Sequence, residues 1–196
     1  MLAYVFWHVP LADSDPHQYE SALVGFHSDL GAEPPPGLEG SATYRVSELA
    51  WLDGRRGYED WCFVASSAAL DTLNQAAVKP ERWEVHAAVS RRTDFGHGGL
   101  YYHLHGDTKP IAGTRVLWLR RPRGIRYEQP LREMIDGATG FLSCWRKLMV
   151  LGPGDEFAIV GDDTLQVTVP AGWQSRVVER TPLGPDLASG AGPGRG

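Results

Sequence analysis

The chain lacks the features by which many membrane, secreted and nucleotide-using proteins are recognised. No apolar run approaches the roughly 18–20 residues needed to span a bilayer, and the first residues have no basic region or cleavage site of a secretion signal. GxSxG, Walker and HExxH runs are absent, and the glycine-rich stretch 96–99 follows no strand-to-helix unit. These absences predict a cytoplasmic protein without a common catalytic signature.

Positive charge is also in short supply. The chain has 19 basic and 24 acidic residues, a formal net charge of -5, whereas a general nucleic-acid binder presents a basic face to the phosphates. A local group of arginines within residues 115–132 forms either a solvated strand end and helix face or an anion site, because guanidinium groups bind carboxylate or phosphate in a fixed fork. We expect neither nucleic acid nor a membrane as a partner.

Cysteine is scarce. Cys62 and Cys144 each lie in an apolar, strand-like context, and neither has a CxxC partner. A metal cage or redox pair built from cysteines is therefore not indicated. We expect two buried, reduced thiols, which suit a reducing cytoplasm.

The first half of the chain contains clear strand and helix patterns. Residues 3–9 are apolar on both alternating faces, which is typical of a strand covered on both sides. The segment 15–18 (DPHQ) predicts a helix start with Asp15 as the N-cap and proline at the first helical position. The apolar stripe of this helix consists of Tyr19, Leu23, Phe26 and Leu30. Further elements are expected as strands over 41–49 and 58–64 around a turn at 53–54, a helix over 67–78, and a strand or helix over 83–89.

Two stretches of the chain repeat one plan. Leu2–Pro10 (LAYVFWHVP) and Arg115–Pro122 (RVLWLRRP) are both apolar and β-rich, with a Trp in the middle and a closing Pro. Each leads into an amphipathic helix pattern and then into two strand candidates. In the second copy these are a helix over 129–136 and strands over 141–151 and 156–161, after which 164–169 alternates like a strand where the first copy has a helix. Such a duplication predicts two half-units around a shared interior.

The repeat divides the chain into four expected parts. They are a first unit over 1–90, a crossover over 91–113, a second unit over 114–181, and a disordered Gly/Pro-rich tail over 182–196. The crossover is the least regular internal segment and has room for a short hairpin or a lid.

A β-α-β-β order written twice over about residues 3–161, with Trp7 and Trp118 at matching places, resembles the ferredoxin-like dimeric α/β-barrel superfamily in a single-chain tandem form. The resemblance implies an α+β fold of two fused ferredoxin-like units that form an internal pseudo-dimeric α/β barrel. It also implies a pocket between each sheet and its helices. Members include cofactor-free monooxygenases of aromatic polyketides, haem-handling enzymes and small-lactone isomerases, so the fold alone does not fix the chemistry.

His8 is the first candidate for catalysis. It lies in the middle of the first predicted strand, where the second copy has Leu119. The charged form of an imidazole is disfavoured in an apolar pocket, so His8 could act as a neutral base. A core histidine bonded to a backbone carbonyl is the structural alternative, and Glu48 or Asp60 could pair with the ring.

Arginines and tryptophans complete the candidate site for an apolar ligand. Arg120 or Arg146 is the candidate partner for an anionic group. Aromatic side chains on strands can line a dry pocket or fill a core. The tryptophans expected to do one or the other are Trp7, Trp61, Trp118 and Trp145.

His103 and His105 (YYHLHG) are the sharpest polar feature. On a regular strand, residues two apart face the same way, so both imidazoles could reach one metal ion. Further ligands would have to come from His8, His86, His97 or Asp107. Two loop histidines without a metal are the alternative.

Together these patterns predict a protein that binds a small, largely apolar molecule in a sheet–helix pocket, and that acts on it as a cofactor-free, monooxygenase-like or isomerase-like enzyme. The alternatives are a non-catalytic ligand-sequestering or assembly module, and a metal-dependent enzyme that uses His103 and His105. The sequence leaves open whether the chain forms a homo-oligomer.

Overall fold

The computed structural model describes residues 1–184, so most of the tail predicted for 182–196 lies outside the described residues. The first unit consists of β1 (Leu2–Pro10), α1 (Pro16–Ala32), β2 (Leu38–Leu49), β3 (Arg55–Val64), α2 (Ala68–Ala77), α3 (Trp83–Ser90) and β4 (Thr93–Gly106). The second unit consists of β5 (Arg115–Arg120), α4 (Glu128–Asp136), β6 (Thr139–Lys147), β7 (Phe157–Gln166) and β8 (Gln174–Leu183). Within 1–184, no helix is both long and apolar enough to cross a bilayer.

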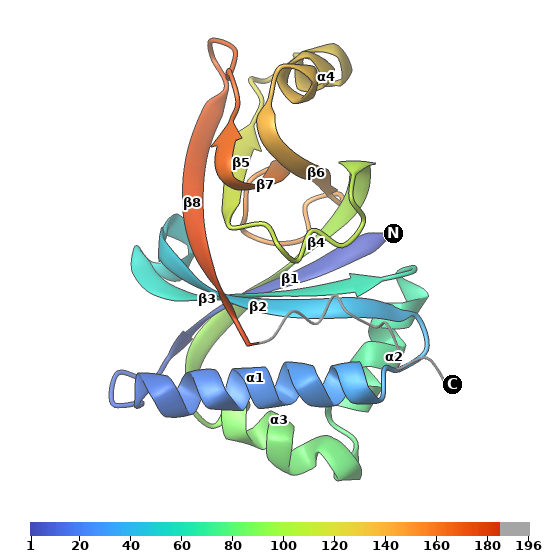
Figure 1. Ribbon diagram of the computed structural model, residues 1–196, viewed down its shortest axis with the longest axis vertical. Coiled ribbons are helices and arrows are strands. Elements are labelled where there is room, and N and C mark those ends of the chain that lie inside the picture. Colours follow the sequence, from blue (N-terminus) through green and yellow to red (C-terminus); the bar gives the residue numbers. More distant parts are fainter. Residues whose placement is uncertain (185–196) are drawn as a thin grey trace, which may run out of the picture.

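The eight strands form one closed antiparallel barrel in the order β1-β3-β2-β8-β5-β7-β6-β4 (Figure 1). The first unit contributes β4-β1-β3-β2, and the second contributes β8-β5-β7-β6. Numbered within each unit, both sheets have the order 4-1-3-2, and the two units meet at the β2–β8 and β4–β6 seams. The barrel is therefore two fused ferredoxin-like units that close on each other within a single chain, as the repeat predicts.

Strand register relates the two units residue by residue. Trp7 on β1 pairs with Glu59 on β3, and Trp118 on β5 pairs with Ala158 on β7. One step along each strand, His8 takes the place that Leu119 takes in the second unit. The same register makes Asp60 on β3 the counterpart of Ile159 on β7.

Alternation along β1 sends one set of side chains into the barrel and the other towards the helices. Val5, Trp7 and Val9 belong to the interior core, in which Trp7 and Trp118 pack edge to face with ring centroids 5.5 Å apart. Such contacts between aromatic rings stabilise a core beyond the area that they bury. The barrel is thus filled by side chains, and its interior is a packed core.

An ion pair lies inside this aromatic core. Arg180 on β8 donates to Glu59 on β3 across 3.0 Å, and both side chains are almost fully buried. Glu59 also accepts from the indole nitrogens of Trp7 and Trp61, each at 2.7 Å, and Arg180 donates to the carbonyl of Gly113. The pair joins the two units, and its hydrogen bonds offset the loss of water around both charges.

Helices cover the outer faces of the two sheets unequally. α1 and α3 lie together below the first sheet in Figure 1, with α2 at its edge, whereas α4 lies at the far end of the molecule against the second sheet. β7 connects to β8 through residues 167–173 without a helix, so the second unit lacks the final helix, as the sequence predicts.

Several expected elements are confirmed and others are corrected. α1 begins as predicted, because the side chain of Asp15 accepts from the amide of Gln18. The expected crossover over 91–113 contains strand β4, which pairs with both β1 and β6, so the first sheet extends beyond residue 90 and includes β4. The strand predicted over 164–169 is wrong: its first residues extend β7, and the last strand of the unit is β8.

Candidate functional site

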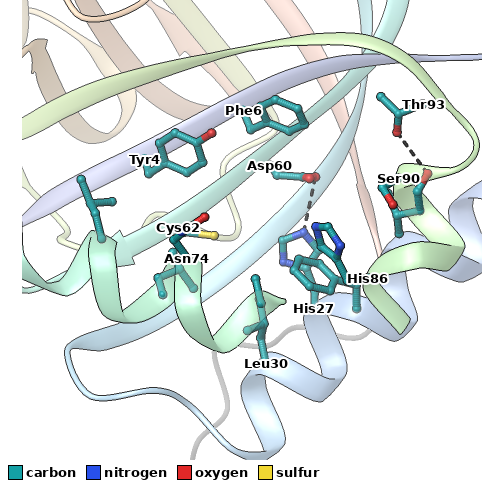
Figure 2. Close-up of a pocket in the computed structure, with 15 residues that line it drawn as sticks. Tyr4, Phe6, His27, Leu30, Asp60, Cys62, Asn74, His86, Ser90 and Thr93 are labelled. Carbon is teal, nitrogen blue, oxygen red and sulfur yellow. Dashed lines mark hydrogen bonds and ion pairs between the residues drawn. The ribbon is translucent and has the colours of Figure 1, made fainter. Parts of the chain in front are cut away.

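A cavity of about 600 Å³ lies between the outer face of the first sheet and helices α1, α2 and α3 (Figure 2). Its volume is within the range of small-molecule sites, roughly 300–1,000 Å³. Its lining is mostly apolar with a few polar groups: Tyr4, Phe6, Phe26, His27, Leu30, Asp60, Cys62, Leu70, Leu73, Asn74, Ala77, His86, Val89, Ser90 and Thr93.

Local structure explains how these side chains come together. On β1, Tyr4 and Phe6 alternate with the interior residues and so face the helices. On α1, the buried stripe continues from Leu23 to His27 and Leu30, at spacings that keep all three on one helical face. The sheet therefore supplies an aromatic floor, and α1 supplies one wall with a polar group in it.

The polar centre of the cavity is the Asp60 carboxylate, which lies between two buried histidines. The Nε2 atom of His8 lies 3.1 Å from Asp60 Oδ2, and the Nε2 atom of His27 lies 3.4 Å from Asp60 Oδ1. Both imidazoles are almost fully buried, at 0% and 1% exposure, and Asp60 is 9% exposed. Figure 2 shows the Asp60 carboxylate pointing from β3 towards His27.

The network extends from both histidines into the protein. His8 Nδ1 lies 2.7 Å from the hydroxyl of Tyr19, which lies 2.8 Å from the hydroxyl of Thr93 at the cavity wall. His27 Nδ1 lies 2.9 Å from the hydroxyl of Ser41. These contacts fix the orientation of both rings, so Asp60 is held in place from two sides.

The charge state of Asp60 follows from these neighbours. Burial by itself raises the pKa of the carboxyl, but His8 and His27 oppose burial and hold the pKa of Asp60 well below its ordinary value of 3.8. Asp60 is therefore ionised at neutral pH, although it lies in a largely apolar wall.

The same shift predicts that this site stabilises the fold at neutral pH and not in acid. Because the pKa of Asp60 is lower in the folded state, its contribution is present above pH 4 and is lost as the pH falls through the folded-state pKa. Urea unfolding at pH 7, 5, 4 and 3 should show a steeper loss of stability for the unaltered protein than for Asp60→Asn. Equal slopes in the two proteins would contradict the ion pairing.

Two further side chains of the cavity are neutral. Burial lowers the pKa of His86, so its ring is uncharged at neutral pH, and its ring packs edge-on against Phe26 at 5.8 Å. Burial, aided by Asp60, raises the pKa of the Cys62 thiol to about 12. Beside the Asp60–His27 pair, the cavity thus presents one neutral imidazole and one unreactive thiol.

The corresponding face of the second unit is packed with apolar side chains. Leu119 stands in the place of His8, and Ile159 stands in the place of Asp60. Both belong to a buried cluster under α4 that consists of Leu117, Leu119, Leu131, Met134, Cys144, Phe157, Ile159 and Leu165. The polar network is a feature of the first unit.

Several solved structures are similar to this chain at low sequence identity. A monooxygenase-like protein from Lactobacillus acidophilus NCFM matches with a TM-score of 0.53 and 8% identity, over 92% of this chain and 95% of that chain. The chain has the dimeric α/β-barrel fold. An anthrone oxidase-like protein matches with a TM-score of 0.47 and 13% identity, over 96% of this chain and 95% of that one. A dimeric ferredoxin-like protein of unknown function from Thermobifida fusca matches with a TM-score of 0.38 and 14% identity, over 50% of this chain and 87% of that one.

No protein-family model and no curated protein sequence matches the chain. The match to the Lactobacillus acidophilus protein supports the fold alone, and the chemistry has to be argued from the residues themselves.

In this α/β barrel, the residues predicted for catalysis do not share one site. His8 lies behind the cavity wall, with its ring nitrogens in contact with Tyr19 and Asp60. Arg120 pairs with Asp155 at 2.8 Å, and Arg146 contacts Glu156 and the ring of Tyr127. Both arginines lie on the second unit, and neither lines the cavity. Of the carboxylates considered for His8, the structure selects Asp60.

The four tryptophans predicted to line a pocket occupy the barrel interior. Trp7, Trp61, Trp118 and Trp145 are at most 1% exposed and belong to one core cluster. None of them is among the residues that line the cavity. Their position is that of core side chains, which was the structural alternative.

His103 and His105 do not sit on a regular stretch of strand. The β4–β6 register shifts between them, so the two-residue alternation that would aim both rings at one ion is interrupted. His103 packs edge-on against Trp145 at 5.0 Å, while His105 is exposed. Among residues 1–184, no three His, Cys, Asp or Glu side chains form a group that could hold a metal ion.

Sequence reasoning did not single out His27 or the role of His86 in the cavity. His27 follows Tyr19 by eight positions and Leu23 by four, so the helical spacing that selected its neighbours could have placed it on the buried stripe. The helical spacing was therefore present in the sequence, but a search for apolar residues at that spacing does not include histidine.

Proposed function

We propose that the first unit binds a small, largely apolar molecule in its sheet–helix cavity and acts on it as a cofactor-free, isomerase-like or monooxygenase-like enzyme. The single observation that carries the proposal is a difference in side chains between equivalent positions of the two units. One unit keeps a cavity with a buried, ionised carboxylate, where the other has Leu119 and Ile159.

Energetics support a functional reason for this difference. Burial of ionised or polar groups opposes folding unless they are well paired, and well-packed apolar residues often replace a buried pair without loss of stability. The second unit has apolar side chains, Leu119 and Ile159, at the equivalent positions of the same strand arrangement. A titratable cluster beside a cavity, at positions that the other unit fills with apolar side chains, is a candidate site for chemistry.

The cavity also suits proton transfer. His86 is a neutral imidazole at neutral pH and lines the cavity, so it can accept a proton from a bound molecule. Asp60, held by His8 and His27, supplies a fixed negative charge that favours positive charge developing nearby. In this arrangement His8 positions Asp60 and does not touch the ligand.

A fluorescent ligand can test whether the cavity binds apolar molecules. N-phenyl-1-naphthylamine is uncharged and brightens in an apolar site, and we expect about one molecule to bind per chain. Asn74 lines the cavity, whereas the adjacent Gln75 does not. Asn74→Trp should block binding, and the matched control Gln75→Trp should not. Equal binding by both variants would place the probe elsewhere and contradict the proposal.

Whether the protein converts its natural ligand or only binds it distinguishes an enzyme from a ligand-sequestering protein. Native mass spectrometry of freshly purified protein should show a co-purified small molecule that Asn74→Trp lacks. Once released and incubated with fresh protein, this molecule should change in mass or isomeric form if the protein is an enzyme. An unchanged molecule would favour the ligand-sequestering alternative.

A further inference from the structure

Apart from the ion pair that they form with each other, two polar atoms at the cavity wall have no hydrogen-bond partner within residues 1–184. They are Oδ1 of Asp60 and Nε2 of His27. They lie 3.4 Å apart, which is long for an N–H···O bond. Both residues are at least nine-tenths buried and line the cavity. Buried polar atoms are rarely left unpaired in native proteins, so this pair marks a place for a ligand atom.

The two atoms have opposite hydrogen-bonding character. An ionised carboxylate can only accept, so Asp60 Oδ1 needs a donor. On the His27 ring, Nδ1 is taken up by Ser41 at 2.9 Å. The carboxylate beside Nε2 favours a proton on that nitrogen, so Nε2 is a donor, and at 3.4 Å it has no acceptor at ordinary hydrogen-bond distance. The wall therefore presents one acceptor and one donor side by side.

We infer that the ligand bound in this cavity carries a hydroxyl group on an apolar frame, with the hydroxyl oxygen accepting from His27 Nε2 and its proton donated to Asp60 Oδ1. A hydroxyl both donates and accepts, so it can satisfy both atoms at once. A carboxylate would bring a second negative charge to Asp60. An ammonium has no lone pair for His27, and an ether has no proton for Asp60.

The remaining lining defines the frame. Tyr4, Phe6 and Phe26 supply aromatic surface, and the buried part of α2 supplies Leu70 and Leu73. None of the lining residues is a lysine or arginine that could neutralise an acid. The ligand class is therefore an uncharged alcohol or enol, and the inference rests on the proposed function of the same cavity.

A matched ligand series tests this selection on the unaltered protein. The four compounds are 4-phenylbutan-1-ol, its methyl ether, 4-phenylbutanoate and 4-phenylbutylammonium, and the readout is the Kd from isothermal titration calorimetry at pH 7. The alcohol should bind at least about tenfold more tightly than each of the others, the change expected from one charge-assisted hydrogen bond.

Removing the charge of Asp60 tests whether this carboxylate causes the preference for the alcohol. Asp60→Asn keeps the size of the side chain and gives it an N–H donor, so the preference for the alcohol over 4-phenylbutanoate should shrink by about tenfold. Asp94→Asn is the matched control, because Asp94 is a surface carboxylate paired with Arg55 and lies outside the cavity lining. It should leave all four affinities unchanged.

The outcomes distinguish the inference from the proposed function. If none of the four compounds binds, the proposed function fails and the inference fails with it. If several bind but the alcohol has no advantage, the cavity is a ligand site and the inference is overturned. Since the unaltered protein already decides this, the inference stays testable even if Asp60→Asn does not fold.

Discussion

Replacing Arg180 with alanine is expected to lower the free energy of unfolding by about 3–5 kcal/mol, because it leaves the carboxylate of Glu59 buried without its counter-charge. Glu59 lies on β3 and is fully buried, so water cannot replace the guanidinium. The substitution also removes a cation–π contact with Tyr44 at 3.9 Å and the hydrogen bond to Gly113. The measurement is urea unfolding at pH 7, followed by circular dichroism.

A surface pair provides the control for this substitution. Arg115 on β5 pairs with Glu179 on β8, the residue next to Arg180, at 3.1 Å, but both side chains are substantially exposed. Arg115→Ala should change stability by no more than about 1 kcal/mol. A similar loss for both variants would mean that the buried pair does not join the units as described.

The second large effect is expected when the first unit is given the residues of the second. His8→Leu alone leaves Asp60 with a missing partner and should destabilise the protein by about 3–5 kcal/mol. The double change His8→Leu with Asp60→Ile copies Leu119 and Ile159, and it should recover a large part of that loss. At the same time the preference for an alcohol ligand should disappear, since Asp60 supplies its acceptor.

A double-mutant cycle measures this recovery. Asp60→Ile alone leaves the Nε2 atom of His8 unpaired, so both single variants should be less stable than the double variant, with a coupling energy of about 1–3 kcal/mol. Additive losses would show that His8 and Asp60 do not act as a pair. Retained selectivity for the alcohol in the double variant would place the recognition elsewhere.

Much of the fold could be predicted because the helix caps and apolar strand patterns in the sequence agree with the elements that the structure contains. Asp15 and the following proline are a local signal for the start of α1, and the side chain of Asp15 caps the helix there. The apolar stretches around Trp7 and Trp118 occupy β1 and β5, and their registers are equivalent. By contrast, β8 was missed because its exposed, charged residues lack the apolar alternation of a core strand. Its place in the barrel comes from pairing with β2 and β5.

The candidate site was harder to predict, since it depends on contacts between distant segments. Asp60 lies 52 positions from its partner His8, and nothing local distinguishes it from Glu48, which the sequence offers equally well. The tryptophans were candidates for a pocket lining, but large aromatic side chains stabilise a protein most when they are buried in the core, where Trp7 and Trp118 lie. The smaller polar residues at the cavity wall come together only through the packing of α1 on the sheet, which brings His27 to Asp60.

The central claim is that ligand recognition belongs to the first unit alone, at the wall formed by Asp60 and His27. Two-dimensional amide NMR during titration with 4-phenylbutan-1-ol tests it directly, because each backbone amide reports on its own surroundings. We expect saturable shifts at residues of α1, α3 and β3 that line the cavity, and unchanged signals from β5, β7 and α4. Shifts centred on the second unit, or an absence of saturable shifts, would contradict the account.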